Sequence, residues 1–187
     1  MLRLWQRLMN TQKTNNSTPD PKTLNMERLK EQLILHEGYR TKADRDSKGI
    51  LTIGVGFNLM RKDAQYLLTS IGADYSAVLR GDHELTDEQI QFLLDYTLSD
   101  SIQSAKAIIN NYDDLFDVRK RVIVDMIFNL GLRGFFKFHR TRQAIEDSEF
   151  KLAAQYMRES LWCGQVKSRC KRLSDMMESG NDYTLQD

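Results

Sequence analysis

Hydrophobic positions recur with helical spacing along most of this chain. Met26, Leu29 and Leu33 fall on one side of a helix predicted over residues 26–37, with Asn25 as its N-cap and Gly38 at its end. A capping box at residues 86–89 opens a second, longer helix, predicted to about residue 110, because apolar residues recur there without an intervening glycine or proline. Such a helix is long enough to bridge two lobes. Shorter helices are predicted over residues 58–71, 137–145, 148–160 and 167–178, together with a strongly apolar one that begins near residue 122 and ends at Gly131.

The period changes to two over residues 39–57, where β-branched residues flank a polar turn at residues 46–49. This pattern predicts a small antiparallel sheet. Gly54 and Gly56 alternate within its last run, which weakens a strand unless something approaches the backbone there. Two interpretations remain open, a bound substrate and a packed neighbouring segment of the chain.

The first 24 residues differ from the rest. Residues 1–10 form a short amphipathic pattern interrupted by arginine, and residues 11–23 contain both prolines of the chain. We therefore expect an extension and linker over residues 1–24 and a folded body over residues 25–187, which keeps its fold and activity when the extension is removed. Residues 1–10 either pack on their own domain or make a weak contact with a membrane surface or a virion protein.

Composition excludes several classes of protein. Of the 187 residues, 41% are hydrophobic and 28% charged, and no apolar run approaches the roughly 18 residues that a membrane span needs. The formal net charge of +1 gives no global attraction to a polyanion, so nucleic acid is not an expected partner. Basic residues nevertheless gather late in the chain, where they either cover solvated helix faces or line a groove for an anionic partner: Arg119, Lys120, Arg121, Arg133, Lys137, Arg140, Arg142, Lys167, Arg169, Lys171 and Arg172.

The two cysteines, Cys163 and Cys170, are seven positions apart. On a continuous helix this separation places them about 10 Å apart, too far for a disulfide. The sequence therefore predicts free thiols and synthesis in a reducing compartment. The three histidines are scattered, and no metal signature is present, so we expect no metal site.

Two carboxyl groups stand out near the predicted sheet. Glu37 borders the apolar stripe of the first helix and lies in its last turn, where partial desolvation and the helix dipole both favour the protonated form that a general acid needs. The alternative is that Glu37 pairs with an arginine such as Arg169 and holds the helix end. Asp46 lies in the polar turn and should stay ionised, although Asp is also common in turns for structural reasons, and Asp44 is a rival with the same chemistry. The Thr52 hydroxyl is placed to hold a water molecule.

The motif formed by Glu37-Gly38, Asp46, Gly49 and the TIGVG run at 52–56 resembles the catalytic hairpin of the T-even phage lysozymes, glycoside hydrolase family 24. The similarity continues with MIFNLG at 126–131 and with Trp162, Arg169, Arg172 and Gly180, and it covers about residues 26–183.

The resemblance implies an α+β, two-lobed fold, with a sheet lobe at about 25–85, a helical lobe at about 86–187, and a cleft that binds peptidoglycan glycan strands. It implies that Glu37 is the general acid and that Asp46 acts with Thr52 on the attacking water, an inverting arrangement. Arg169 matches an arginine that pairs with the acid. The positions that match sugar contacts are Asn58, Phe128, Asn129 and Thr141.

The activity implied is that of a muramidase, which hydrolyses the β-1,4 bond between N-acetylmuramic acid and N-acetylglucosamine and needs no cofactor. The alternatives are a lytic transglycosylase, in which Glu37 does both acid and base work, and a non-catalytic glycan-binding virion module. We expect a monomer. It would either wait in the host cytoplasm as an endolysin until its release to the wall or travel in the virion.

Overall fold

The computed structural model describes residues 20–46 and 49–183. Its helices are α2 (Met26–Glu37), α3 (Ala64–Ser70), α4 (Tyr75–Arg80), α5 (Asp87–Ile108), the 3-10 turn η1 (Tyr112–Asp114), α6 (Asp117–Phe136), α7 (His139–Glu146), α8 (Phe150–Arg158), α9 (Leu161–Val166) and α10 (Ser168–Ser179). The strands β1 (Arg40–Arg45), β2 (Leu51–Gly54) and β3 (Phe57–Asn58) form an antiparallel sheet in the order β1-β2-β3.

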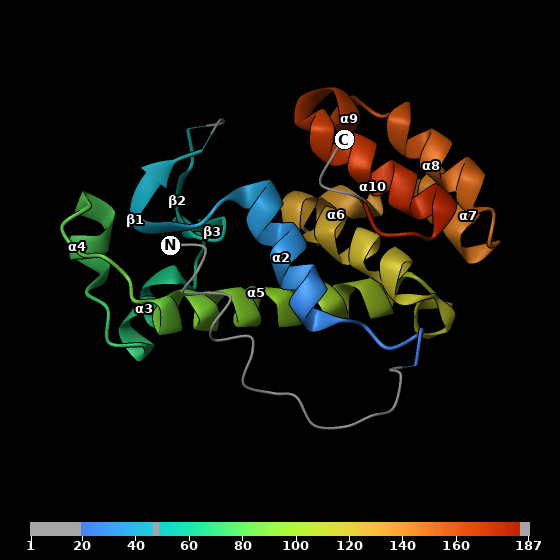
Figure 1. Ribbon diagram of the computed structural model, residues 1–187. Coiled ribbons are helices and arrows are strands. Elements are labelled where there is room, and N and C mark those ends of the chain that lie inside the picture. The colour runs from blue at the N-terminus through green and yellow to red at the C-terminus, as the bar shows by residue number, and fades with distance from the viewer. Residues whose placement is uncertain (1–19, 47–48, 184–187) are drawn as a thin grey trace.

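The elements separate into two lobes (Figure 1). The sheet lies with α3 and α4 on one side of the molecule, and α7 to α10 gather on the other, while α5 extends from one group to the other. α5 packs against β2, β3 and α6, so it joins the lobes as its length predicts. The α+β, two-lobed expectation is confirmed. None of the helices in the described part of the chain is both long and apolar enough to cross a bilayer.

Local signals in the sequence set the two helices that frame the sheet. The side chain of Asn25 accepts a hydrogen bond from the Arg28 amide at 3.0 Å, which caps α2, and Gly38 ends the helix with a φ of +80°. Thr86 and Gln89 form the expected capping box at the start of α5. Both helices therefore begin where their capping residues predict.

Two other expectations differ from the structure. Residues 58–71 are not one helix, because Asn58 pairs with Thr52 in the sheet and its side chain accepts the Met60 amide at 2.7 Å, which forms a turn instead. α3 begins only at Ala64. The helix expected to end at Gly131 is broken there, with a φ of +68°, and continues to Phe136.

The folded body also begins earlier than predicted. The Asp117 amide donates to the carbonyl of Pro21 at 2.9 Å, and the Lys120 ammonium donates to the carbonyl of Lys22 at 2.7 Å. Residues 20–24 are thus attached to the start of α6 and are not a free linker. The amphipathic pattern of residues 1–10 and the middle of the predicted turn, residues 47 and 48, lie outside the described residues.

Candidate active site

Glu37 lies at the C-terminal end of α2, where the chain enters the sheet, and its side chain is 20% exposed. Its Oε1 accepts a hydrogen bond from Nη1 of Arg169 on α10 at 2.5 Å. Arg40, at the start of β1, donates to the Glu37 backbone carbonyl at 3.3 Å. The structure therefore contains the Glu37–Arg169 pair that the sequence suggested. This pair by itself fits either a structural or a catalytic glutamate.

The two glycines of the hairpin are approached by other parts of the chain. A Cβ on Gly56 would lie 3.0 Å from Glu37 Oε2, and a Cβ on Gly54 would lie 3.3 Å from the Ile90 side chain. Gly56 is not in a strand but in the turn between β2 and β3, with a φ of +65°. A packed neighbouring segment is thus the correct interpretation at both positions. At Gly56 that neighbour is the proposed acid itself.

Asp46 and Thr52 belong to the same hairpin. The Asp46 Oδ1 accepts the Ile50 amide at 2.8 Å, which holds the carboxyl group at the end of the turn. Thr52 is the cross-strand partner of Asp44, and its hydroxyl donates to the Asp44 carbonyl at 3.3 Å. The Asp44 carboxylate is largely exposed and lies 3.8 Å from Nε of Arg40. Position on the hairpin does not exclude Asp44, so the two acids must be separated by substitution.

A buried polar cluster lies behind Glu37. Asp125 of α6 is fully buried, and its carboxylate accepts hydrogen bonds from Arg169, His36 and Gln32. Burial alone would raise the pKa of Asp125, but Arg169 and the His36 and Gln32 donors together hold it below its usual value. Burial likewise acts to lower the pKa of Arg169, and Asp125 and Glu37 outweigh that effect and raise it.

Sequence reasoning missed Asp125, His36 and Gln32 as part of the site. One signal was present, because Asp125 is a lone acid inside the apolar run from Val122 to Ile127. A carboxylate at such a position is almost never fully buried unless it is paired.

The residues expected to contact sugar fall into two groups. Asn58 lies in the sheet next to Thr52, its cross-strand partner. Phe128 and Asn129 lie on α6, and Asn129 Oδ1 accepts the indole N–H of Trp162 at 2.9 Å. Thr141 of α7 is only 1% exposed, so a sugar could reach its hydroxyl only if neighbouring side chains moved.

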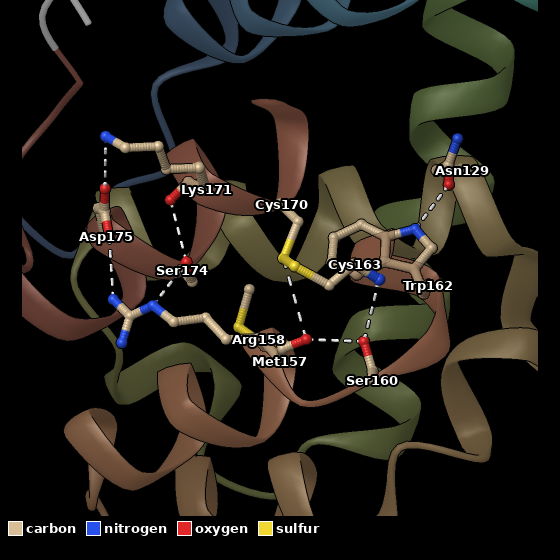
Figure 2. Close-up of a disulfide and its surroundings, with 10 residues drawn as sticks. All are labelled: Asn129, Met157, Arg158, Ser160, Trp162, Cys163, Cys170, Lys171, Ser174 and Asp175. Atoms are coloured by element: carbon tan, nitrogen blue, oxygen red, sulfur yellow. Dashed lines mark hydrogen bonds and ion pairs between the residues drawn. A yellow bond between two sulfur atoms is a disulfide. The ribbon is translucent and has the colours of Figure 1, made fainter. Parts of the chain in front are cut away.

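The prediction of free thiols is wrong. Cys163 and Cys170 form a disulfide, with their Cα atoms 5.1 Å apart. The calculation from a continuous helix fails because the chain breaks at Lys167, with φ +42° and ψ −100°, and α10 begins a new direction. Figure 2 shows the disulfide joining α9 to α10, beside the Trp162 side chain and its hydrogen bond to Asn129. The inference of a reducing compartment, which depended on free thiols, no longer stands.

Several of the clustered basic residues are used inside the protein. Arg121 is 1% exposed and binds Asp117 and Asp182, Lys120 is 5% exposed, and Arg119 donates to the carbonyls of Met177 and Glu178. These residues and Arg169 are not solvated helix faces and do not offer a free cationic surface. Their role in the described structure is to hold helices together.

Comparison with known proteins gives a consistent result. A family model described as phage lysozyme matches residues 35–173. The chain is 26% identical over 160 residues to probable T4-type lysozyme 1 of Dictyostelium discoideum, an alignment that covers 81% of this chain and 94% of that protein. It is also 26% identical over 160 residues to the pre-baseplate central spike protein Gp5 of Enterobacteria phage T4, covering 82% of this chain and 28% of that longer protein.

Proposed function

Because the chain belongs to the phage lysozyme family and is therefore a lysozyme-type glycosidase, we propose that it hydrolyses the β-1,4 bond between N-acetylmuramic acid and N-acetylglucosamine in peptidoglycan. The substrate would lie between the sheet and helical lobes, with Asn58, Phe128 and Asn129 as sugar contacts. Thr141 could join them only after a local rearrangement. The reaction would open the bacterial wall during lysis or during entry.

In the proposed mechanism Glu37 donates a proton to the glycosidic oxygen, so that the leaving sugar departs as a neutral alcohol. Asp46 accepts a proton from a water molecule that the Thr52 hydroxyl helps to hold. The water attacks the opposite face of the sugar, which inverts the configuration at the anomeric carbon. After one turnover the proton lost by Glu37 and the proton gained by Asp46 are exchanged with solvent.

The observation that best supports this proposal is the placement of Glu37. Its carboxyl group is held between Arg169 of the helical lobe and the glycine turn of the sheet lobe, and it remains partly exposed. A glutamate that served only to end α2 would not require a neighbouring turn with no side chain. The same hairpin carries Asp46 and Thr52, so the acid and the water-binding groups belong to one local unit.

The first experiment compares three nearly isosteric variants: Glu37→Gln, Asp46→Asn and Asp44→Asn. Clearance of outer-membrane-permeabilised Gram-negative cells gives the rate, and thermal unfolding confirms that each variant folds. Loss of a general acid or base costs about 10²- to 10⁴-fold, so the first two variants should lose at least that much and Asp44→Asn little. A folded Glu37→Gln protein with the parental rate would contradict the enzyme mechanism. A large loss in Asp44→Asn alone would move the water-binding role to Asp44.

Product analysis separates the alternatives. A muramidase leaves reducing muramic acid ends, and an inverting one gives the α-anomer first, which proton NMR detects before mutarotation. A lytic transglycosylase would leave anhydro ends and would tolerate Asp46→Asn. A glycan-binding module would bind wall fragments and release no products.

We also propose that the protein acts without a metal or cofactor and as a monomer. Its residence as an endolysin in the host cytoplasm and its transport in the virion both remain proposals. The similarity to a phage spike protein supports the virion role. Mass spectrometry of purified particles, compared with lysates collected before release, would distinguish the two.

A further inference from the structure

Arg169 contacts two carboxylates at once. Its Nη1 donates to Glu37 Oε1 at 2.5 Å, while Nη2 and Nε lie 2.7 and 2.8 Å from Asp125 Oδ1. Nη2 also donates to the Asp125 backbone carbonyl at 3.3 Å. The side chains of Arg169 and Asp125 are 7% and 0% exposed, so water screens their interaction only weakly. More of the guanidinium is thus directed at Asp125 than at Glu37.

This geometry bears on a difficulty in the proposed mechanism. A general acid must hold a proton, but an adjacent positive charge favours the ionised carboxylate, typically by about one to three pH units. Arg169 would therefore oppose the role of Glu37 if its charge were not balanced. A second carboxylate on the same guanidinium supplies that balance.

The contacts of Asp125 show that it is built to stay ionised. Its Oδ2 accepts from Gln32 Nε2 at 2.6 Å and from His36 Nδ1 at 2.8 Å. On the other side of the imidazole, Arg172 Nε donates to His36 Nε2 at 3.2 Å. With Nε2 as the acceptor, the hydrogen on Nδ1 is the one that His36 donates to Asp125. Every described contact of the Asp125 carboxylate is with a hydrogen-bond donor, and such contacts favour its ionised form.

We propose that Asp125 is a positioning residue that balances the positive charge of Arg169 and so keeps that charge from opposing proton donation by Glu37. This inference rests on the proposed function. Two other charged groups lie close to Glu37: Arg40 on β1 donates to its backbone carbonyl, and Arg172 on α10 donates to the neighbouring His36. Asp125 differs from them because it shares with Glu37 the guanidinium that binds the acid.

The test is the pH dependence of wall hydrolysis in Asp125→Asn. Without the second carboxylate, the positive charge of Arg169 acts on Glu37 alone, so the high-pH limb of kcat should move down by about one pH unit or more. Activity above neutral pH should then fall about tenfold or more, while the rate on the acidic side changes much less. A residue with only a structural role would lower the rate equally at every pH, and that result would overturn the proposal.

The matched control is Asp63→Asn. Asp63 also forms an ion pair with an arginine, Arg61, at 2.6 Å, but on the sheet side of the molecule and outside the Glu37 cluster. This variant should lose some stability and leave the high-pH limb in place. An equal shift in both variants would show that the effect is not specific to Asp125.

A second measurement covers the case in which Asp125→Asn does not fold. Carboxyl carbon NMR of the unmodified protein reports the ionisation of Asp125 and Glu37 separately. We expect Asp125 to be ionised at every pH at which Glu37 loses its proton. Titration of Asp125 together with Glu37, or at a higher pH, would overturn the proposal. The spectra require no enzymatic activity, so they test the ionisation of Asp125 and Glu37 even if the muramidase proposal is wrong.

Discussion

Replacement of Gly56 by alanine tests whether the glycine turn sets the position of Glu37. The new Cβ would lie 3.0 Å from Glu37 Oε2 and 3.2 Å from its Cβ and Cδ. Contacts this close with three atoms of one side chain cannot be relieved by rotating its tip alone. The carboxyl group, or the turn, must shift by several tenths of an ångström. Either movement changes the contact between Glu37 and the turn at Gly56.

The variant should lose stability and activity for separate reasons. A left-handed conformation costs an alanine about 1–2 kcal/mol, and the smaller entropy of its unfolded chain offsets about 0.4–1 kcal/mol of this. A net loss of roughly 1 kcal/mol lowers the Tm of a domain of this size by about 2–4 °C. Displacement of a catalytic group by about 1 Å can cost 10²-fold, so a smaller shift should reduce kcat by about 10- to 100-fold.

Gly72→Ala is the matched control. Gly72 has a φ of +77°, close to that of Gly56, but a Cβ there meets nothing within 4 Å. Thermal unfolding followed by circular dichroism should show a loss of Tm for both variants, at least as large for Gly56→Ala, and only Gly56→Ala should clear permeabilised cells slowly. If Gly56→Ala lysed cells at the parental rate, the contact with Glu37 would have no part in catalysis.

Three further outcomes are expected. Chain entropy in the closed loop assigns the disulfide about 2.5 kcal/mol, so a reducing agent should lower the Tm of the parent and leave that of the Cys163→Ser/Cys170→Ser double variant unchanged. Removal of residues 1–19 keeps every described contact and should preserve the Tm and the lytic rate. Removal of residues 1–24 also removes the Lys22 carbonyl that accepts a hydrogen bond from the buried Lys120, so it should lower the Tm. Folding lowers the pKa of Asp125, so the stability that its carboxylate contributes is fully present above its unfolded pKa of about 3.9 and is lost as the pH falls through the lower folded pKa. Denaturant unfolding at a series of pH values should therefore show that the difference in stability between the parent and Asp125→Asn shrinks in that acidic range.

The parts of the fold that the sequence predicts well are those specified by nearby residues. The caps at Asn25 and Thr86 act over three positions, and the change of period after Gly38 needs only the hairpin itself. The prediction of a helix from residue 58 was wrong because the local sequence around Asn58 is compatible with either a helix or a strand. Pairing with Thr52 of the neighbouring strand places Asn58 in the sheet.

The cluster of Glu37, Arg169 and Asp125 was only partly predictable because its contacts join residues that are far apart in the sequence. Arg169 is separated in sequence from Glu37 by 132 positions and from Asp125 by 44. Hydrophobic periodicity predicts local elements and cannot predict contacts between residues so far apart. The resemblance supplied the first contact, but no motif pointed to the second. The prediction of free thiols failed for a related reason: the disulfide depends on a break at Lys167, a position that is neither glycine nor proline.

In the proposed mechanism, the position of Glu37 couples the stability of the lobe junction to catalysis. The acid is attached to α2, contacts an arginine of the helical lobe and lies against a turn of the sheet lobe. Any change that moves one lobe relative to the other must therefore alter at least one of these contacts. A buried ion pair such as Arg169–Asp125 seldom adds net stability, because burying the two charges costs about as much as their attraction returns. Its placement against the acid accounts for it better as a means of setting the charge around Glu37 than as a means of holding the fold together.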